Sequence, residues 1–268
     1  QVRYRKIKIR MMKKLLIDAD MLLFAAVKLC EVEIEWMPDV ITTHLPLKEV
    51  SLLFDEMVTN KKTQAEADEV ILCWTSIDNF RNKVDPSYKA NRRATNHRLK
   101  PVGFKEARNR MENKYNSECW YRLEADDVLG ILQTRDCGKD TVIWSGDKDL
   151  NQIPGLHLDN DGNVKTITEP EADVFFYRQV LIGDSVDGFG GCPSIGPKTA
   201  EKLIPLKDFT PASAWRTVVS TYKKKDLSEQ YALVQARLAR ILRSTEYSYN
   251  DISLWTPPIP VTTVMTKP

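Results

Sequence analysis

The stretch LLIDAD, residues 15–20, sets a short apolar run directly before an aspartate, Asp18. The same order recurs in TVIWSGDKD, residues 141–149, where Asp147 and Asp149 follow an apolar run. Short apolar runs bounded by polar residues are typical of buried strands. We therefore expect a sheet in which carboxylates follow the last residues of the strands.

Strands and helices are expected to alternate along the first two thirds of the chain. Apolar runs predict strands at 14–17, 70–74, 119–123 and 141–144, and helical periodicity predicts helices at 47–58, 104–115 and 125–134. Such alternation is typical of the α/β class, with a mostly parallel twisted sheet and helices on both faces. Ligands of such sheets bind beyond the carboxyl ends of the strands.

The remainder of the chain is expected to be mainly helical. Residues 156–167 predict a hairpin with Asp161-Gly162 in the turn, and helices are expected at 171–183, 197–204, 212–224 and 227–243. We therefore predict a disordered basic leader at 1–11 and an α/β domain at 12–182 with a mobile helical basic region at about 81–110. A helical region at 183–256 and an extended tail at 257–268 complete the expected organisation.

Composition excludes several classes of protein. The 268 residues are 42% hydrophobic, which is enough for a substantial core. The chain has no apolar run of the roughly 18 residues that a membrane span needs and no secretory signal pattern, so we expect a soluble intracellular protein. The five cysteines are scattered and the three histidines fit no zinc motif, which argues against a disulfide framework and a zinc site.

Charge is informative by its distribution. The net charge of +2 becomes −3 without residues 1–11, so the overall balance does not indicate a nucleic-acid partner. Residues 81–110, however, hold ten Lys or Arg against two acidic residues. Alone, this stretch would be a solvated helix face. Beside clusters of carboxylates, it indicates attraction of phosphate to a site that would otherwise repel it.

Carboxylates gather in three clusters besides Asp18. The clusters are LEADD with Glu124, Asp126 and Asp127; SGDKD with Asp147 and Asp149; and GDSVDG with Asp184 and Asp187. An oxygen-only set of this size is typical of Mg²⁺ or Mn²⁺ sites. Helix capping or a turn would explain any single cluster. A calcium loop at Asp147 is excluded, because Gln152 replaces the required glycine and Leu158 the bidentate Glu.

A glycine-rich loop follows the last cluster. The stretch GFGGCPSIGPKTAEKLI, residues 188–204, lacks the lysine of a P-loop because Pro197 occupies that position. It predicts a helix that begins at Pro197, where backbone N–H groups, Lys198 and Thr199 would contact a phosphate without reading bases. The alternative is an ordinary helix–loop–helix connection.

Taken together, these motifs resemble the 5′ nuclease (flap endonuclease) superfamily, and most closely the 5′-to-3′ exonucleases of short-tailed phages. The resemblance extends from Leu15 to Trp255 and rests on LLIDAD, VDPSYKANR, LEADD, SGDKD, GDSVDG with GCPSIGPKTA, and ARILRSTEY. The order of LEADD, DKD, GDxxD and IGPKTA is what makes the resemblance specific.

The resemblance implies a site with two Mg²⁺ or Mn²⁺ ions. It implies that Asp18, Glu124, Asp126 and Asp127 surround the first ion, and that Asp147, Asp149, Asp184 and Asp187 serve the second. Lys89 and Arg92 match the basic pair that meets the scissile phosphate. The implied DNA contacts are Tyr88, Arg93, Gly191, Ser194, Ile195, Gly196, Lys198 and Thr199, with K⁺ as a further candidate cation at the glycine loop. For Tyr88, stacking on a terminal base and plain packing remain alternatives.

One position departs from the family pattern. The family usually has an Asp after the second strand, where this chain reads CWTSIDNF, residues 73–80. Asp78 is the nearest candidate ligand and is displaced by about two residues.

The predicted activity is metal-dependent 5′-to-3′ hydrolysis of duplex DNA, with flap cutting and removal of RNA from RNA–DNA hybrids. The expected partners are duplex DNA with a 5′ end or flap, an RNA–DNA hybrid and replication proteins such as a single-stranded-DNA-binding protein, in the host cytoplasm and without a membrane. Two other functions remain open at this stage: a non-catalytic DNA-binding module and a PIN-type metal-dependent ribonuclease.

Overall fold

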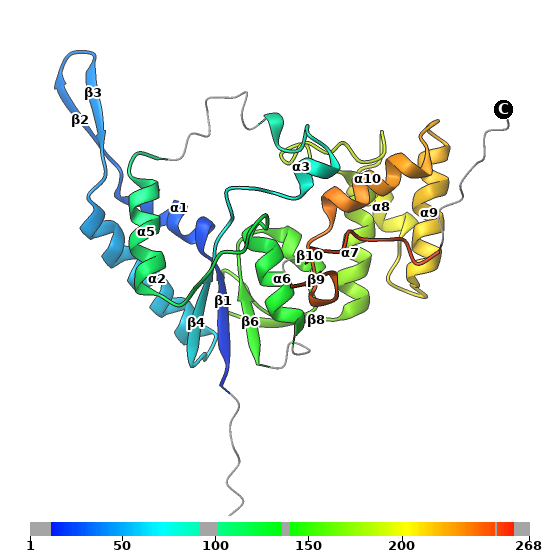
Figure 1. Cartoon of the computed structure of the whole chain (residues 1–268), viewed down its shortest axis with the longest axis horizontal. Coiled ribbons are helices and arrows are strands. Elements are labelled where there is room, and N and C mark those ends of the chain that lie inside the picture. The colour runs from blue at the N-terminus through cyan, green and yellow to red at the C-terminus, as the bar shows by residue number, and fades with distance from the viewer. Residues whose placement is uncertain (1–11, 92–100, 136–139, 250, 260–268) are drawn as a thin grey trace, which may run out of the picture.

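A six-stranded sheet forms the centre of the molecule (Figure 1). The computed structural model describes residues 12–91, 101–135, 140–249 and 251–259. The strand order is β5-β4-β1-β6-β7-β8, with β5 at Ser117–Glu118, β4 at Glu69–Cys73, β1 at Lys14–Asp18, β6 at Thr141–Trp144, β7 at Gly155–Leu158 and β8 at Val164–Ile167. All neighbours pair in parallel except β7 and β8, which pair antiparallel. The expected mostly parallel α/β fold is confirmed.

Strand β1 shows why both faces of this sheet are buried. Leu16 pairs in register with Ile71 and Ile143, and all three side chains belong to one hydrophobic cluster. Leu15 and Ile17 point to the opposite face and belong to another cluster. Continuous apolar runs are required because successive side chains of a strand alternate between two covered faces.

Helices cover the two faces unequally. Three of them, α1 (Ala19–Cys30), α2 (Leu47–Gln64) and α5 (Phe104–Lys114), pack on the face that carries Leu15 and Ile17. Helix α6 (Ala125–Arg135) and residues 241–242 cover the other face. Asp18 caps α1, since its carboxylate accepts a hydrogen bond of 3.1 Å from the Met21 N–H. The carboxyl end of the central strand therefore passes directly into a helix start.

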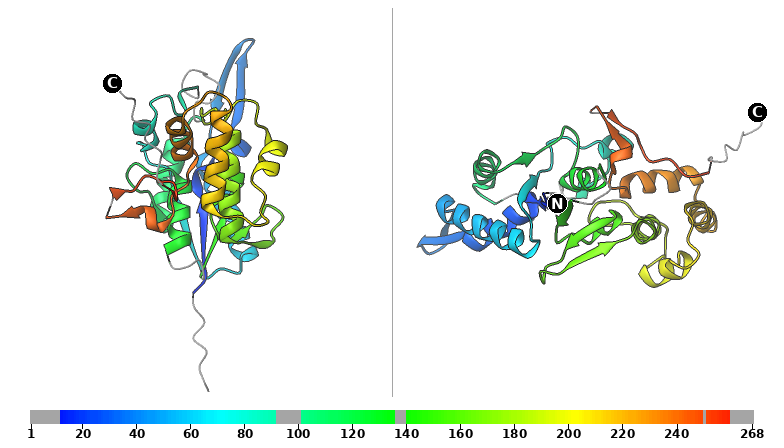
Figure 2. Two further views of the ribbon diagram at one scale, coloured as in Figure 1. Left: turned by 90° about the vertical axis from the view of Figure 1, so that its right-hand side faces the viewer. Right: turned by 90° about the horizontal axis from the view of Figure 1, so that it is seen from below.

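The later helices pack together beside the sheet (Figures 1 and 2) and enclose a second hydrophobic core. These helices are α7 (Glu169–Ile182), α8 (Pro197–Leu203), α9 (Pro211–Lys223) and α10 (Glu229–Ala239). Trp215 and Tyr222 are fully buried among them. Thr168 and Glu171 form a capping box that fixes the start of α7. This core packs α8, α9 and α10 against α7.

Several short elements complete the described chain. The elements are α3 (Arg81–Val84), the 3₁₀ turns η2 (Lys148–Gln152) and η3 (Ser244–Glu246), and the strands β9 (Tyr247–Ser248) and β10 (Asp251–Ile252). Strands β2 (Val32–Met37) and β3 (Val40–His44) form an antiparallel hairpin that projects from the molecule (Figure 1). Among the described residues, every helix is too short or too polar to cross a bilayer.

Two predictions about secondary structure need correction. The expected strand at 119–123 is wrong, because β5 ends at Glu118 and the chain then turns through Arg122, whose φ is 64°. The prediction assumed that the apolar residues of 119–123 are buried in a strand, but Cys119 is exposed. The last long helix ends at Ala239 instead of residue 243. The leader at 1–11 and residues 92–100 of the basic region lie outside the described residues.

Candidate metal centre

A cavity of about 630 Å³ lies at the carboxyl ends of the parallel strands. Eight carboxylates line it, namely Asp18, Asp20, Glu124, Asp126, Asp147, Asp149, Asp184 and Asp187. Seven of them were candidate ligands in the sequence, and Asp20 is an addition. Strand ends, helix starts and the loop after α7 thus bring together acidic residues that are far apart in the sequence.

Asp18 and Asp126 are buried beside other carboxylates. Burial raises the pKa of Asp18 to about 6, with further contributions from Asp20 and Asp147, although hydrogen bonds from Met21 N–H and Ser145 Oγ oppose the shift. Burial also raises the pKa of Asp126 well above its usual value, and the negative charges of Asp18 and Asp147 add to this. Ionised carboxylates held together in this way are stabilised by a cation.

Asp149 offers an oxygen atom with no partner. Its Oδ1 is buried and accepts no hydrogen bond from the described residues. Burial raises the pKa of Asp149 to about 6, and the nearby charge of Asp147 raises it further. Asp147 itself caps the η2 turn by accepting a hydrogen bond of 2.9 Å from the Asp149 N–H. An orphaned carboxylate oxygen beside other acids fits a hard divalent cation.

The described residues do not form a closed metal site by themselves. Within residues 12–91, 101–135, 140–249 and 251–259, no group of three or more His, Cys, Asp or Glu side chains is close enough to hold an ion. The donor set, oxygen-only and partly desolvated, nevertheless fits Mg²⁺ or Mn²⁺.

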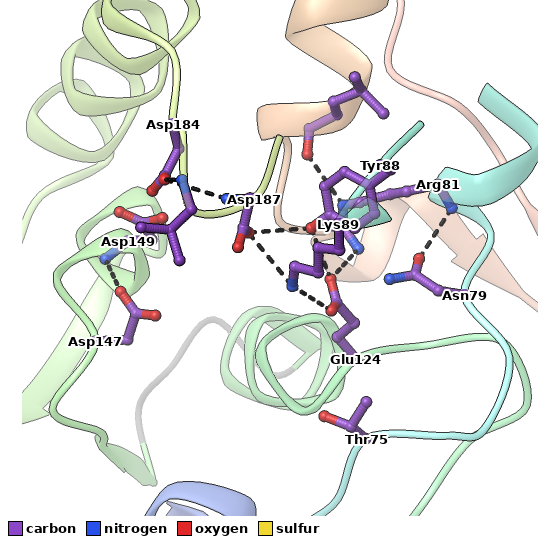
Figure 3. Close-up of polar contacts among 12 residues, drawn as sticks. Thr75, Asn79, Arg81, Tyr88, Lys89, Glu124, Asp147, Asp149, Asp184 and Asp187 are labelled. Carbon is purple, nitrogen blue, oxygen red and sulfur yellow. Dashed lines mark hydrogen bonds and ion pairs between the residues drawn. The ribbon is translucent and has the colours of Figure 1, made fainter. Parts of the chain in front are cut away.

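Lys89 supplies a cation at one side of the cavity. Its Nζ ion-pairs with Oε1 of Glu124 and lies 3.3 Å from Oδ2 of Asp187. The Tyr88 hydroxyl lies 3.0 Å from Glu124 and 3.1 Å from Asp187, so the four side chains form one network (Figure 3). Burial alone would raise the pKa of Glu124, but Lys89 and Arg81 outweigh it and lower this pKa to about 2.

The backbone of Lys89 is fixed to the loop that carries Asp184 and Asp187. Lys89 has a φ of 54°, and its N–H donates a hydrogen bond of 2.9 Å to the Asp187 carbonyl. Gly188 permits this approach, since a Cβ there would lie 3.2 Å from the Lys89 nitrogen. The Asn91 amide donates a bond of 2.7 Å to the Ser185 carbonyl. Arg92 and Arg93 lie outside the described residues.

Tyr88 is placed for packing rather than stacking. Its side chain is only 3% exposed and belongs to the second hydrophobic core. The ring is therefore not available to an unpaired base in this structure, and of the two alternatives its burial favours the packing role. Burial also raises the pKa of Tyr88, which keeps its hydroxyl neutral and able to donate to a carboxylate.

Two candidate ligands do not line the cavity. Asp127 is fully buried and binds Arg81 through both carboxylate oxygens. Asp78 is exposed and accepts a hydrogen bond of 3.3 Å from the Tyr121 hydroxyl. Thr75, two residues after the end of β4, lines the cavity instead. The Thr75 N–H donates a hydrogen bond of 2.7 Å to Asp20. The sequence interpretation did not include Asp20 among the candidate ligands, although Asp20 stands in the same motif as Asp18.

The glycine-rich loop has the predicted helix start. Helix α8 begins at Pro197, and Gly196, Lys198 and Thr199 are exposed there. Ser194 is also exposed, with a φ of 66°, and Ile195 is partly buried. Gly191 differs, because it is buried and its N–H donates a bond of 3.0 Å to the Gln235 side chain. The exposed part of the loop is thus residues 193–199, apart from Ile195.

Comparison with known proteins identifies the family. Residues 13–174 match the model of the 5′-3′ exonuclease N-terminal resolvase-like domain, which is more than half of the chain. The chain belongs to the 5′-3′ exonuclease family. The exodeoxyribonuclease of Enterobacteria phage T3 is 29% identical, over 91% of this chain and 92% of that protein. The exonuclease of Escherichia phage T7 is 28% identical, over 91% and 93%.

Solved structures show the same fold for this member of the 5′-3′ exonuclease family. The phage T5 flap endonuclease bound to DNA and metal ions superposes with a TM-score of 0.64 at 13% identity, covering 87% of this chain and 90% of that one. A second T5 structure, co-crystallised with metal ions, has a TM-score of 0.62 at 15% identity, covering 87% and 90%. At such low identity the likeness establishes the fold alone.

Proposed function

We propose that this chain is a divalent-metal-dependent 5′-to-3′ exonuclease that hydrolyses phosphodiester bonds at the 5′ ends of duplex DNA. The observation that carries the proposal is that eight carboxylates and Lys89 line the same cavity, with Lys89 in contact with two of them, Glu124 and Asp187. Anionic groups alone would repel a phosphodiester, and the lysine alone would only bind it. Their combination suits hydrolysis assisted by metal ions.

The cavity residues divide into two groups by position. Asp18, Glu124 and Asp126 lie at the end of β1 and the start of α6, and we propose them for a first ion. Asp147, Asp149, Asp184 and Asp187 lie after β6 and after α7, and we propose them for a second. When bound, such a pair of Mg²⁺ or Mn²⁺ ions supplies an activated water and charge neutralisation at the phosphate.

Lys89 would contact the scissile phosphate. Its side chain is 22% exposed at the rim of the carboxylate network, so a small rotation of the side chain would bring the ammonium to an incoming phosphate. Loss of a group that stabilises transition-state charge costs on the order of 10² to 10³ in rate. Arg92 is proposed for the same role by family resemblance.

The loop before α8 would bind the backbone of the duplex at a point outside the cavity. Ser194, Gly196, Lys198 and Thr199 expose hydroxyl, ammonium and backbone groups that can bind phosphate oxygens without reading bases. K⁺ at the loop carbonyls, flap cutting, action on RNA–DNA hybrids, cooperation with replication proteins and location in the host cytoplasm are proposed from the family resemblance alone.

Product analysis tests the proposal. Duplex, nicked, flapped and hybrid substrates labelled at the 5′ end would be incubated with Mg²⁺ or with chelator. We expect the 5′ label to be released before the rest of the strand is degraded, and only when Mg²⁺ is present. The variant Asp147→Asn/Asp149→Asn should lose at least about 10² in rate, whereas Asp161→Asn in the exposed β7–β8 turn should not.

Each contrary outcome favours another function. Undiminished cleavage by the double variant would rule out the proposed site. DNA binding without turnover in Mn²⁺ would favour a non-catalytic DNA-binding module. Cleavage restricted to single-stranded RNA would favour a PIN-type ribonuclease.

A further inference from the structure

Arg81 is a buried cation beside the carboxylate cavity, and all of its N–H donors make hydrogen bonds. Its side chain is 3% exposed, although it stands in a stretch whose charges are otherwise expected to face solvent. The guanidinium has five N–H donors. It makes five hydrogen bonds: to the two Asp127 oxygens at 2.7 and 2.8 Å, to Glu124 Oε2 at 3.2 Å, to the Leu238 carbonyl at 3.0 Å and to the Arg240 carbonyl at 2.6 Å.

Asp127 has no acceptor capacity left for a metal ion. An ionised carboxylate has about four lone-pair positions. Asp127 accepts two bonds from Arg81, one of 3.1 Å from the Leu242 N–H and one of 3.2 Å from the Glu124 N–H. It is fully buried and does not line the cavity, whereas its neighbour Asp126 does.

The Arg81–Asp127 pair joins the metal centre to the C-terminal part of the chain. Leu238, Ala239 and Ile241 form part of the cavity wall, and Arg81 binds two carbonyl groups of this segment. Gly130 of α6 lets the segment come close, since a Cβ there would lie 2.4 Å from the Leu242 carbonyl oxygen. The wall and the start of α6 are therefore held in one position.

Glu124 is the cavity residue that this pair orients. Arg81 and Tyr88 both contact Oε2, while Oε1 faces Lys89. If Lys89 turned toward a phosphate, Arg81 would still hold Oε2 and leave Oε1 directed into the cavity. An oriented carboxylate binds a cation more tightly than a mobile one.

We propose that Arg81 is a positioning residue of the metal centre, and that Asp127 anchors Arg81 instead of binding a metal ion. This inference rests on the proposed function for its metal ions, whereas the Arg81–Asp127 pair is observed independently of that function. A buried pair behaves distinctively under mutation, because removal of one partner strands the other as an uncompensated charge. A direct metal ligand would not show this dependence on Arg81.

A double-mutant cycle tests the proposal. The variants are Arg81→Met, Asp127→Asn and both together, with Asp126→Asn as the matched control from the same helix turn. The readouts are the Tm in EDTA and the Kd for Mn²⁺ by calorimetry. Each single change at Arg81 or Asp127 should lower the Tm. Adding Asp127→Asn to Arg81→Met should instead raise the Tm, because it removes the stranded carboxylate.

Mn²⁺ affinity should follow the same logic. Arg81→Met should weaken binding about 10- to 100-fold, the usual effect of losing a group that orients a ligand. Adding Asp127→Asn should change the Kd by less than about twofold, whereas Asp126→Asn alone should weaken binding at least about tenfold without lowering the Tm in EDTA. If Arg81→Met does not fold, Arg81→Gln takes its place in the cycle, because it also removes the charge but keeps an N–H donor for the Leu238 or Arg240 carbonyl.

The outcomes separate this inference from the proposed function. A further tenfold loss of Mn²⁺ affinity on adding Asp127→Asn would show that Asp127 is a ligand and overturn the proposal. Unchanged affinity in the Arg81 variant, or Tm changes that simply add, would also overturn it. Failure of the unmodified protein to bind Mn²⁺ would contradict the proposed function, while the reversal in Tm would still decide whether Arg81 and Asp127 act as a pair.

Discussion

Replacing Lys89 with Met tests whether this lysine stands in for a metal cation. Lys89 and Arg81 lower the pKa of Glu124 from 4.5 to about 2 despite its burial. At 1.36 kcal/mol per pKa unit, the net favourable interaction of the carboxylate is about 3 kcal/mol. Lys89 makes the largest favourable contribution to this shift, and neither side chain is more than a quarter exposed. Lys89→Met should therefore cost about 1–2 kcal/mol of unfolding free energy in EDTA.

The pH dependence fixes the sign of this effect. Because the folded pKa of Glu124 is depressed, its contribution to stability is present above about pH 4.5 and is lost as the pH falls toward about 2. Urea unfolding in EDTA should show the difference between unmodified protein and variant at pH 7, and a smaller difference at pH 3.5. Lys105→Met, at an exposed position of α5, is the matched control and should show neither effect.

Mn²⁺ binding should change in the opposite direction to stability. A metal ion no longer has to displace the ammonium from Glu124 and Asp187, so Lys89→Met should bind Mn²⁺ up to about tenfold more tightly, which corresponds to 1.4 kcal/mol. Calorimetry measures this directly. Equal stability at pH 7 together with equal or weaker Mn²⁺ affinity would refute the interpretation of Lys89 as a cation substitute.

Three further predictions follow from the site and the core. Asp149→Asn should raise the unfolding free energy in EDTA at pH 7 by about 1–2 kcal/mol, because the Asp149 pKa of about 6 shows that its ionised form is unfavourable in the folded protein. Urea unfolding should show that this gain disappears below pH 3.8, where the carboxyl group is protonated in the folded and the unfolded protein. Asp20→Asn should lower the rate of Mg²⁺-dependent DNA digestion at least about tenfold, while Asp78→Asn should leave it within about twofold, as initial rates on labelled duplex will show. His157 is buried and donates to the Ile153 carbonyl, and burial lowers its pKa to about 4. The contribution of His157 to the unfolding free energy should thus fall by up to about 3 kcal/mol as the pH drops from 6.5 to 4. Urea titrations of the unmodified protein and of His157→Gln isolate this contribution as the difference between the two proteins.

The sequence predicted the sheet and most of the site because both depend on local patterns. Apolar runs at β1, β4 and β6 are continuous since both faces of the strands are covered, and parallel strands bring their carboxyl ends to one edge. Asp18 and Asp147 could thus be placed together without coordinates. The antiparallel β7–β8 hairpin was likewise predictable from its Asp-Gly turn.

The missed features depend on tertiary contacts. Spacing in LEADD puts Glu124 and Asp127 on one helix face, but only packing shows that Asp127 turns inward to Arg81. Arg81 was counted as one charge of a basic stretch because burial of an arginine has no sequence signal. The β2–β3 hairpin was not predicted either, and its apolar residues Trp36, Met37 and Ile41 are exposed rather than part of a core.

The most direct measurement of the central claim is anomalous diffraction from crystals of the protein soaked in Mn²⁺. We predict two anomalous peaks in the cavity, roughly 3.5 to 4 Å apart, one in contact with Asp18 and Asp126 and the other with Asp149 and Asp184. Peaks only outside the cavity, or no peak at Mn²⁺ concentrations that support DNA digestion, would contradict the account.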